Sequence, residues 1–280
     1  VHLALAKANQ LRKRPEYRAG LAGKKDLVPY LGCHKNGASY RQFTGEAGVG
    51  TSGGSQDHAA ILLSRAGQLN QWSFSPFHRL GTVAWPDDLV LTVAVSGVLA
   101  EKTSAARAHF NRVADRARAA ATAWNLATGR SDASIGAAAI ACGASAVLSA
   151  ITDADLRLRA EQTIIETTEV VPGAVAALAA GDLARFGALT VRSQAMAGTH
   201  LQNQIPETIA LVASAHLHGA VAASAFGAGF GGAVWAAFRR GHDGADAWIA
   251  DYRRRFPQHS SVASLHRITP GPGAIALGLA

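Results

Sequence analysis

The sequence has 280 residues, of which 49% are hydrophobic and 16% are charged, and its formal net charge is +8. This length and apolar content predict a folded protein with one large or two modest domains, and they exclude a disordered chain. The basic runs at residues 11–18 and 251–256 are short and lack interleaved aromatic residues, so we expect an anionic small ligand and no nucleic-acid partner.

Two further features bound the class of protein. Cys33 and Cys142 lie far apart without metal-ligand spacing, which predicts a reduced, cytoplasmic protein. Residues 213–238 contain no Asp, Glu, Lys or Arg, but they include two histidines and several glycines. This composition favours a buried helix–loop–strand segment, so we expect no membrane span.

Apolar periodicity, caps and glycine breaks divide the chain into many helices and a few strands. We expect helical segments at residues 1–11, 27–31, 58–66, 104–127, 153–168, 172–178, 182–196, 206–218 and 243–256. We expect strands at residues 69–74, 89–95, 219–225, 233–238 and 274–277. Residues 131–150 are nearly all small and are expected to pack tightly against neighbouring helices. The order, with helices segregated from the strands, predicts an α+β fold.

A glycine-rich segment at residues 45–58, GEAGVGTSGGSQDH, ends in the acidic residue Asp57. Its five glycines permit backbone conformations that other residues avoid and let a ligand approach the main chain closely. Loops that hold phosphates usually avoid carboxylates, which would repel the anion. Asp57 therefore indicates a base or a hydroxyl-binding group beside a phosphate site. A helix cap is the alternative role, and one residue can fill both.

A second glycine loop, Phe226–Gly232 (FGAGFGG), lies between a helical stretch and a strand. It lacks the Gly-Lys-Ser/Thr of a Walker loop, and a dinucleotide fingerprint would precede a helix. By itself the loop is equally consistent with a structural turn.

Two other arrangements of reactive residues are weaker. His200, His216 and His218 do not share a helix face and have no nearby carboxylate in the sequence, so we expect no metal site. Ser52, Asp57 and His58 are too close in the sequence to assemble a hydrolytic triad.

Residues 218–238 resemble the third conserved motif of the GHMP small-molecule kinases, typified by galactokinase. The matching positions are Gly219, Ala220, Gly227, Gly229, Phe230, Gly231 and Gly232, with Ala228 where glycine is usual. Residues 54–57 resemble the galactokinase G-x-x-D-Q element, with His58 in place of Gln. Residues 96–112 are similar to the element that ends in Tyr-Asn-x-Arg, with Lys102 as its basic residue and Phe110-Asn111 as its Tyr-Asn pair. Residues 193–207 give a fourth, weaker match to a helix and loop of the family.

The resemblance implies an α+β, GHMP-kinase-like two-layer architecture. Residues 1–125 would form the remainder of an N-terminal kinase domain, similar to ribosomal protein S5, that carries the Asp57 loop. Residues 126–280 would form a ferredoxin-like C-terminal GHMP domain with the third motif. The first two family motifs, which orient the sugar and wrap the ATP phosphates, are absent, so the chain resembles the C-terminal two-thirds of a galactokinase-like protein. Its opening residues resemble the middle of a helix, and we expect a segment upstream of Val1.

The resemblance also implies a function, an ATP-dependent kinase that phosphorylates the anomeric hydroxyl of galactose or a related aldose. Asp57 would be the catalytic base, with Gly54, Asp57 and Phe110 at the sugar and Lys102 or Arg107 supporting developing charge. The phosphate loop would comprise Gly227, Gly229, Phe230, Gly231 and Gly232. ATP and Mg²⁺ would be required, and the protein would be a cytoplasmic monomer or dimer. The alternative is a catalytically impaired sugar-binding or regulatory relative.

Overall fold

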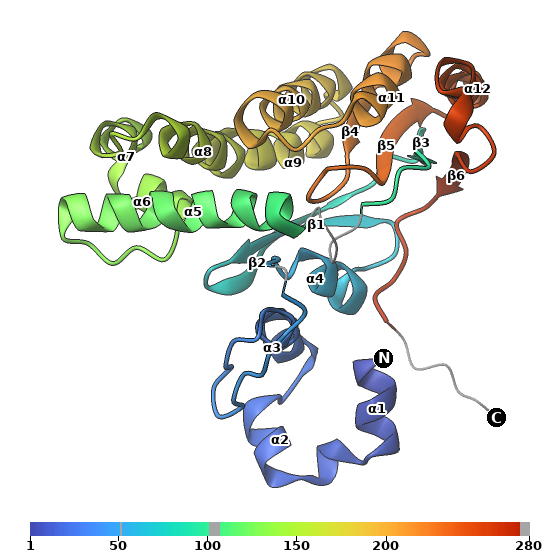
Figure 1. Ribbon diagram of the computed structural model, residues 1–280. Helices are drawn as coiled ribbons and strands as arrows, with labels where there is room; N and C mark the ends of the chain where they lie inside the picture. Colours follow the sequence, from blue (N-terminus) through green and yellow to red (C-terminus); the bar gives the residue numbers. More distant parts are fainter. Residues whose placement is uncertain (51, 101–106, 275–280) are drawn as a thin grey trace.

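Helices make up most of the chain in the computed structural model, which describes residues 1–50, 52–100 and 107–274 (Figure 1). The first elements are α1 (His2–Ala8), a 3₁₀ turn (Leu11–Lys13), α2 (Pro15–Gly20), α3 (Lys24–Asn36), α4 (Gln56–Leu63), β1 (Gln68–Phe74), β2 (Phe77–Ala84) and β3 (Leu89–Val95). Next come α5 (Arg107–Thr128), α6 (Ile135–Cys142), α7 (Ala144–Ala150), α8 (Ala154–Ile165), a π turn (Glu166–Val170), α9 (Val171–Ala179), α10 (Leu183–Met196) and a second π turn (Ala197–Leu201). The last are α11 (Pro206–Leu217), β4 (Ala222–Ala225), β5 (Ala233–Arg239), α12 (Gly244–Arg255), a 3₁₀ turn (Pro257–His259) and β6 (Ser264–Ile268).

The larger sheet has four antiparallel strands in the order β4-β5-β3-β6. Its elements follow the chain as β3, α11, β4, β5, α12 and β6, the β-α-β-β-α-β order of a ferredoxin-like unit. Helices α5 to α10 are inserted between β3 and α11, and Figure 1 shows α5 to α8 extending away from the sheet. The expected α+β class and the ferredoxin-like unit are confirmed.

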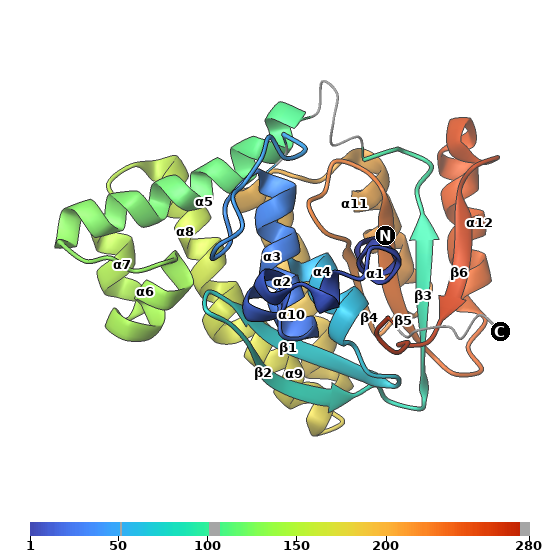
Figure 2. The same ribbon diagram turned by 90° about the horizontal axis from the view of Figure 1, so that it is seen from below.

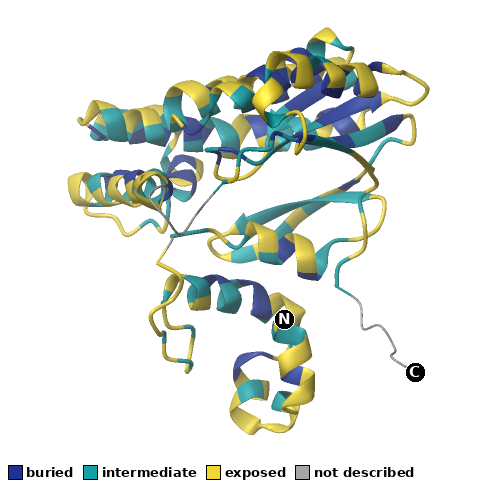
Figure 3. Cartoon of the chain, turned by 45° about the vertical axis from the view of Figure 1, so that its right-hand side comes forward, coloured by how far each residue is buried: buried dark blue, intermediate teal, exposed yellow. Residues whose placement is uncertain are grey.

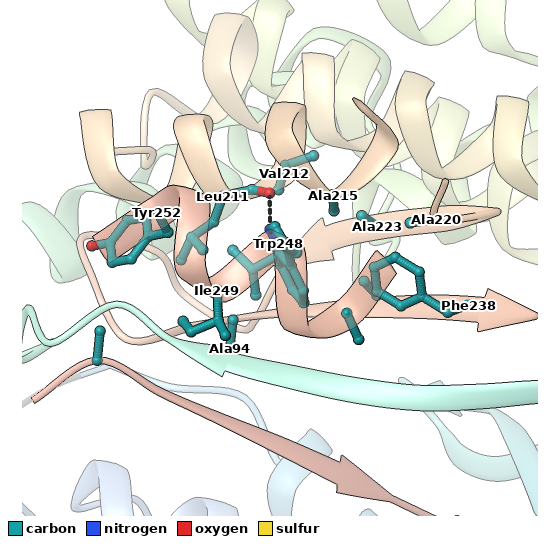
Figure 4. Close-up of a cluster of buried hydrophobic side chains, with 14 residues drawn as sticks. Ala94, Leu211, Val212, Ala215, Ala220, Ala223, Phe238, Trp248, Ile249 and Tyr252 are labelled. Atoms are coloured by element: carbon teal, nitrogen blue, oxygen red, sulfur yellow. Dashed lines mark hydrogen bonds between the residues drawn. The ribbon is translucent and has the colours of Figure 1, made fainter. Parts of the chain in front are cut away.

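One face of this sheet is covered by α11 and α12 (Figure 4). Trp248, Ile249 and Tyr252 stand on one side of α12 at the spacing of a helix face and pack with Leu211 of α11 and Phe238 of β5. The indole Nε1 of Trp248 donates to the Leu211 carbonyl oxygen at 2.8 Å, so the buried ring also satisfies its polar group. This face is the main hydrophobic core.

The opposite face of the sheet packs on α9, α10 and the β1–β2 hairpin. Leu89, Ala222 and Ala237 of the sheet contact Ala177 and Leu178 of α9, Phe186 of α10 and Val83 of β2. Alternate residues of β5 thus serve the two cores, with Phe238 in one and Ala237 in the other. The sheet is therefore buried on both sides.

The N-terminal helices form a smaller layer on the other side of the β1–β2 hairpin. Leu27 and Val28 of α3 and Ala59 and Leu62 of α4 make its core, against Trp72 of β1. Figure 2 shows α1 to α4 together in front of the sheets, and Figure 3 shows that buried residues are sparser here than along the C-terminal sheet. This layer carries the first glycine loop, which joins α3 to α4. Within the described ranges, no helix is both long and apolar enough to cross a membrane.

The structure corrects several expected elements. Strands β2 and β6 and helix α2 were not predicted, because their sequences are rich in polar residues and their strands lack a buried apolar run. Helix α1 ends at Ala8. Residues 135–150 form two helices separated by Gly143, whose φ is +85°, and they pack against α5 and α8 as expected. Ala274 is not in a strand, and the rest of the strand expected at 274–277 lies outside the described residues.

The expected domain division between residues 125 and 126 does not follow the sheet. Strand β3 lies before this division, yet it is hydrogen-bonded between β5 and β6, which lie after it. A boundary at this position would therefore separate β3 from the two strands to which it is hydrogen-bonded.

Candidate active site

The first glycine loop is held by the last turn of α3. The Asn36 side-chain amide donates to the Gly53 carbonyl at 2.8 Å and accepts from the Gly53 N–H at 2.9 Å. Lys35 Nζ donates to the Gly54 carbonyl at 2.8 Å, and the Lys35 carbonyl accepts from the Val49 N–H at 2.9 Å. Two adjacent helix residues therefore fix both ends of the segment that leads to Asp57.

Asp57 is the second residue of α4 and does not cap it. The N-cap is Ser55, and no side chain makes a capping hydrogen bond. The Asp57 side chain is 58% exposed, with Oδ1 lying 3.7 Å from Lys35 Nζ and Oδ2 lying 3.9 Å from His58 Nδ1. The carboxylate lies in the first turn of α4, where the helix dipole favours negative charge, and a lysine ammonium lies close by. Both oxygens remain open to a ligand hydroxyl.

His58 is the less exposed member of this pair. Burial lowers the pKa of its imidazole and nearby Lys35 lowers it further, while the Asp57 carboxylate opposes both effects. Its Nε2 is buried and has no hydrogen-bond partner among the described residues. The lowered pKa favours a neutral imidazole near pH 7, so it does not compete with Lys35 as the cation beside Asp57.

The first turns of α5 connect the two glycine loops. The Asn111 side chain accepts from the Ser52 N–H at 2.8 Å and donates to the Gly50 carbonyl at 3.1 Å. The neighbouring Phe110 packs edge-to-face on Phe230 of the second loop, with ring centroids 5.0 Å apart. The Phe110-Asn111 pair therefore contacts both loops at once. Phe110 is only 4% exposed, and its role at the sugar stays a prediction.

The second glycine loop has a strained backbone that its glycines permit. Gly229, Phe230, Gly231 and Gly232 all have positive φ, and Phe230 is one of few non-glycine residues of this protein to do so. A Cβ on Gly229 would lie well inside 3.0 Å of the Asn203 backbone oxygen, which instead accepts from the Phe230 N–H at 2.7 Å. Ala228, where the family has glycine, does not have positive φ, so the substitution is tolerated without strain.

The second loop is also tied to the end of β3. The Ser96 hydroxyl donates to the Gly232 carbonyl at 2.7 Å and accepts from the Val98 N–H at 3.1 Å. The Ser96 carbonyl accepts from the Tyr252 hydroxyl at 2.7 Å. Burial raises the pKa of Tyr252 to about 12, so this hydroxyl stays a donor at all physiological pH values. The sheet and α12 thus set the position of the loop.

A cavity of about 510 Å³ lies between the β1–β2 hairpin, the C-terminal sheet and α9 and α10. Its lining is largely apolar, including Trp85 and Trp235, with Glu166 among the polar groups. Gln56, which precedes Asp57, and Phe226, which begins the second loop, both border it. The two predicted segments therefore meet at the rim of one cavity of a size that suits small ligands.

Other sequence-predicted residues are placed less centrally or not at all. Arg107 lies beside the first loop, since a Cβ on Gly50 would be 3.0 Å from its Nη1. Lys102 lies outside the described residues. His200, His216 and His218 belong to no metal-binding group, since the described part of the chain holds no cluster of three or more His, Cys, Asp or Glu suited to a metal ion.

Sequence reasoning missed Lys35, Asn36 and Asn203. Lys35 and Asn36 reach residues 17 to 19 positions away, and Asn203 reaches one 25 positions away. A Lys-Asn pair at a helix end carries no recognisable motif. The one available signal was the Gly37 that follows it, which ends α3 with φ of +71°.

The comparisons with known proteins bear on the C-terminal part of the chain and on the fold. Residues 174–254 match the family model described as GHMP kinases C terminal, a segment that runs from α9 into α12 and includes the second glycine loop. This part of the chain therefore resembles the C-terminal domain of the GHMP kinases.

The fold as a whole is galactokinase-like. The crystal structure of Lactococcus lactis galactokinase complexed with galactose matches 91% of this chain with a TM-score of 0.75 and 21% sequence identity. The match covers 61% of that galactokinase, so the chain spans less than two-thirds of its length.

A second solved structure gives a weaker likeness. L. major mevalonate kinase in complex with R-mevalonate matches 69% of this chain and 47% of its own, with 18% identity and a TM-score of 0.39, too low to support an argument. Curated protein sequences give no match.

Proposed function

We propose that this chain acts in an ATP-dependent sugar kinase that transfers the γ-phosphate of ATP to the anomeric hydroxyl of galactose or a related aldose. One observation carries the proposal. Asp57 is an exposed carboxylate 3.7 Å from a lysine ammonium, and its neighbour Gln56 shares a cavity with the second glycine loop in a galactokinase-like fold. We further propose a cytoplasmic monomer or dimer that binds sugar and ATP.

The second glycine loop suits the phosphates of ATP. Its N–H groups at Gly227, Ala228, Gly229 and Gly231 donate to no other residue in the described ranges. Free backbone N–H groups in a glycine loop are a common phosphate-binding device. They supply positive potential without a side chain in the way.

Magnesium is a different case. The described residues hold no group of three or more His, Cys, Asp or Glu suited to a metal ion. Magnesium in kinases is bound largely by substrate phosphates, water and one or two carboxylates. We assign no step to it.

The chemistry assigned to this chain is a proton transfer and its positioning. As the anomeric oxygen forms a bond to the γ-phosphorus, the bond from that phosphorus to the bridging oxygen of ADP breaks, and Asp57 accepts the hydroxyl proton. Apart from its two chain neighbours, no residue has an atom within 4 Å of where a Cβ on Gly54 would stand, which leaves open space at this point of the loop for the sugar. Positioning and charge then supply most of the rate.

Substitution of Asp57 tests the proposal. ADP release by the whole protein that contains this chain is measured with galactose and a panel of aldoses, for the native protein, Asp57→Asn and the control Asp87→Asn, which changes an exposed carboxylate before β3. We expect Asp57→Asn to lower kcat by about 10²–10⁴-fold and the control to match the native chain.

Equal rates for native and Asp57→Asn would overturn the proposed role of the carboxylate. Galactose binding by calorimetry without ADP release from any aldose would favour the non-catalytic sugar-binding relative instead.

A further inference from the structure

Lys35 touches both parts of the first loop that the proposed reaction uses. Its Nζ lies 2.8 Å from the Gly54 carbonyl oxygen and 3.7 Å from Asp57 Oδ1. Its side chain runs directly against the loop, because a Cβ on Gly53 would be 3.0 Å from Nζ and 3.1 Å from Cε. The side chain is 26% exposed, so most of it is enclosed by these contacts.

The geometry of the ammonium explains why one lysine serves two partners. An ammonium carries three N–H donors, and the Gly54 carbonyl takes one of them. The distance to Asp57 is longer than a hydrogen bond and within the range of an ion pair. Within the described ranges, the ion-pair partner of Lys35 is Asp57. The lysine therefore orients the carboxylate without occupying either of its oxygens.

No other group described near the loop combines a positive charge with contact to both Gly54 and Asp57. His58 faces the other oxygen of Asp57, and its lowered pKa favours the neutral form. Asn36, the next residue on α3, fixes Gly53 through two hydrogen bonds but carries no charge. Arg107 lies at Gly50, four positions before Gly54.

We propose that Lys35 is a positioning residue for the phosphoryl transfer, joining the Gly54 backbone to the Asp57 carboxylate so that loop and base hold one arrangement. This inference rests on the proposed sugar-kinase function. It predicts two separable effects of removing the ammonium. The loop loses a tether, and the base loses the cation that orients it.

Three lysine variants separate charge from packing. Lys35→Met keeps most of the side-chain volume and removes the charge, while Lys35→Arg keeps the charge. Lys25→Met is the matched control, an exposed lysine on the same helix that donates no hydrogen bond to another residue in the described ranges. Hydrogen exchange followed by mass spectrometry reports the loop at residues 45–58 without requiring turnover, and ADP release with galactose reports the reaction.

We expect Lys35→Met to speed amide exchange in the loop at least tenfold and to lower kcat at least tenfold, with the sugar KM within about threefold of the native value. Lys35→Arg should recover part of kcat, and Lys25→Met should match the native chain in both measurements. The inference is overturned if Lys35→Met exchanges like the control. It is also overturned if its loop loosens while kcat stays native, because Lys35 would then be structural only.

The exchange arm separates this inference from the proposed function. If the whole native protein phosphorylates no aldose, the proposed function fails, and the loop exchange of Lys35→Met still confirms or refutes the tether. If the native chain is active and Asp57→Asn is inactive, both arms apply.

Discussion

The hydrogen bond from Tyr252 to Ser96 gives the sharpest stability prediction, because both groups are buried and one atom can be removed. Tyr252 is 1% exposed and Ser96 is fully buried, and the hydroxyl donates to the carbonyl at 2.7 Å. Tyr252→Phe removes this donor with almost no change in apolar volume. It leaves a buried carbonyl whose hydrogen-bond partner among the described residues was this hydroxyl.

The size of the loss follows from that unpaired carbonyl. Leaving a buried polar group without its partner costs about 1–3 kcal/mol, so we expect Tyr252→Phe to lower the free energy of unfolding by that amount. Urea unfolding followed by tryptophan fluorescence measures it, with Trp248 one turn away on α12. Tyr40→Phe is the matched control, because the Tyr40 hydroxyl makes no hydrogen bond to another described residue, and its loss should stay within about 0.5 kcal/mol.

The pH dependence of the same pair provides an independent check. Burial raises the pKa of Tyr252 to about 12, whereas the pKa of a tyrosine in the unfolded chain is about 10. Between these values the unfolded chain releases a proton that the folded protein retains, so this contribution to stability falls as the pH rises. The stability gap between native protein and Tyr252→Phe should therefore narrow from pH 9 to pH 12. A gap that widens, or no loss at pH 8, would refute the reasoning.

Two further predictions concern the glycine loop and the acid side of the pH range. Gly229→Ala places a Cβ against the Asn203 backbone oxygen at positive φ, so it should lower the free energy of unfolding by more than about 3 kcal/mol. Gly227→Ala is also at positive φ but faces open space, so it should lower the free energy of unfolding by about 1 kcal/mol. Equal losses for the two variants in urea unfolding would contradict this reasoning. Burial lowers the pKa of His58 below that of a histidine in the unfolded chain, so the unfolded chain takes up a proton first as the pH drops below about 7. The free energy of unfolding should therefore fall on this side of the pH range. His58→Gln should lose less of it between pH 7.5 and 5.5 than the native protein. An unchanged acid loss in His58→Gln would show that other groups, such as His2, whose pKa burial also lowers, account for it.

The sequence predicted strands well where both faces of the strand are buried, and poorly where one face is exposed. Strand β3, LVLTVAV, is sandwiched between two cores, so its continuous apolar run located it at residues 89–95. Strand β2, FHRLGTVA, belongs to a two-stranded sheet with exposed positions along its length, and β6 is an edge strand with three exposed residues. Neither leaves an apolar pattern that local reasoning can detect.

The candidate site divides in the same way. The glycines and Asp57 are marked by local composition, and the chain order of the motifs indicated their family. The residues that hold them in place, Lys35 and Asn203, act through contacts between distant positions. An ordinary lysine or asparagine acquires such a role only when helix and loop have come together.

The insertion of α5 to α10 between β3 and the rest of its sheet has a consequence for synthesis on the ribosome. The Thr92 hydroxyl of β3 bonds the Ala236 carbonyl of β5 across 144 positions, so the central strand is made long before its neighbours. During that interval an apolar segment with two unpaired edges is exposed, which is the state most prone to aggregation. The helices α5 to α10 can form from local contacts in the meantime. We therefore expect the yield of folded protein to depend on chaperones that shield residues 89–95 until β5 emerges.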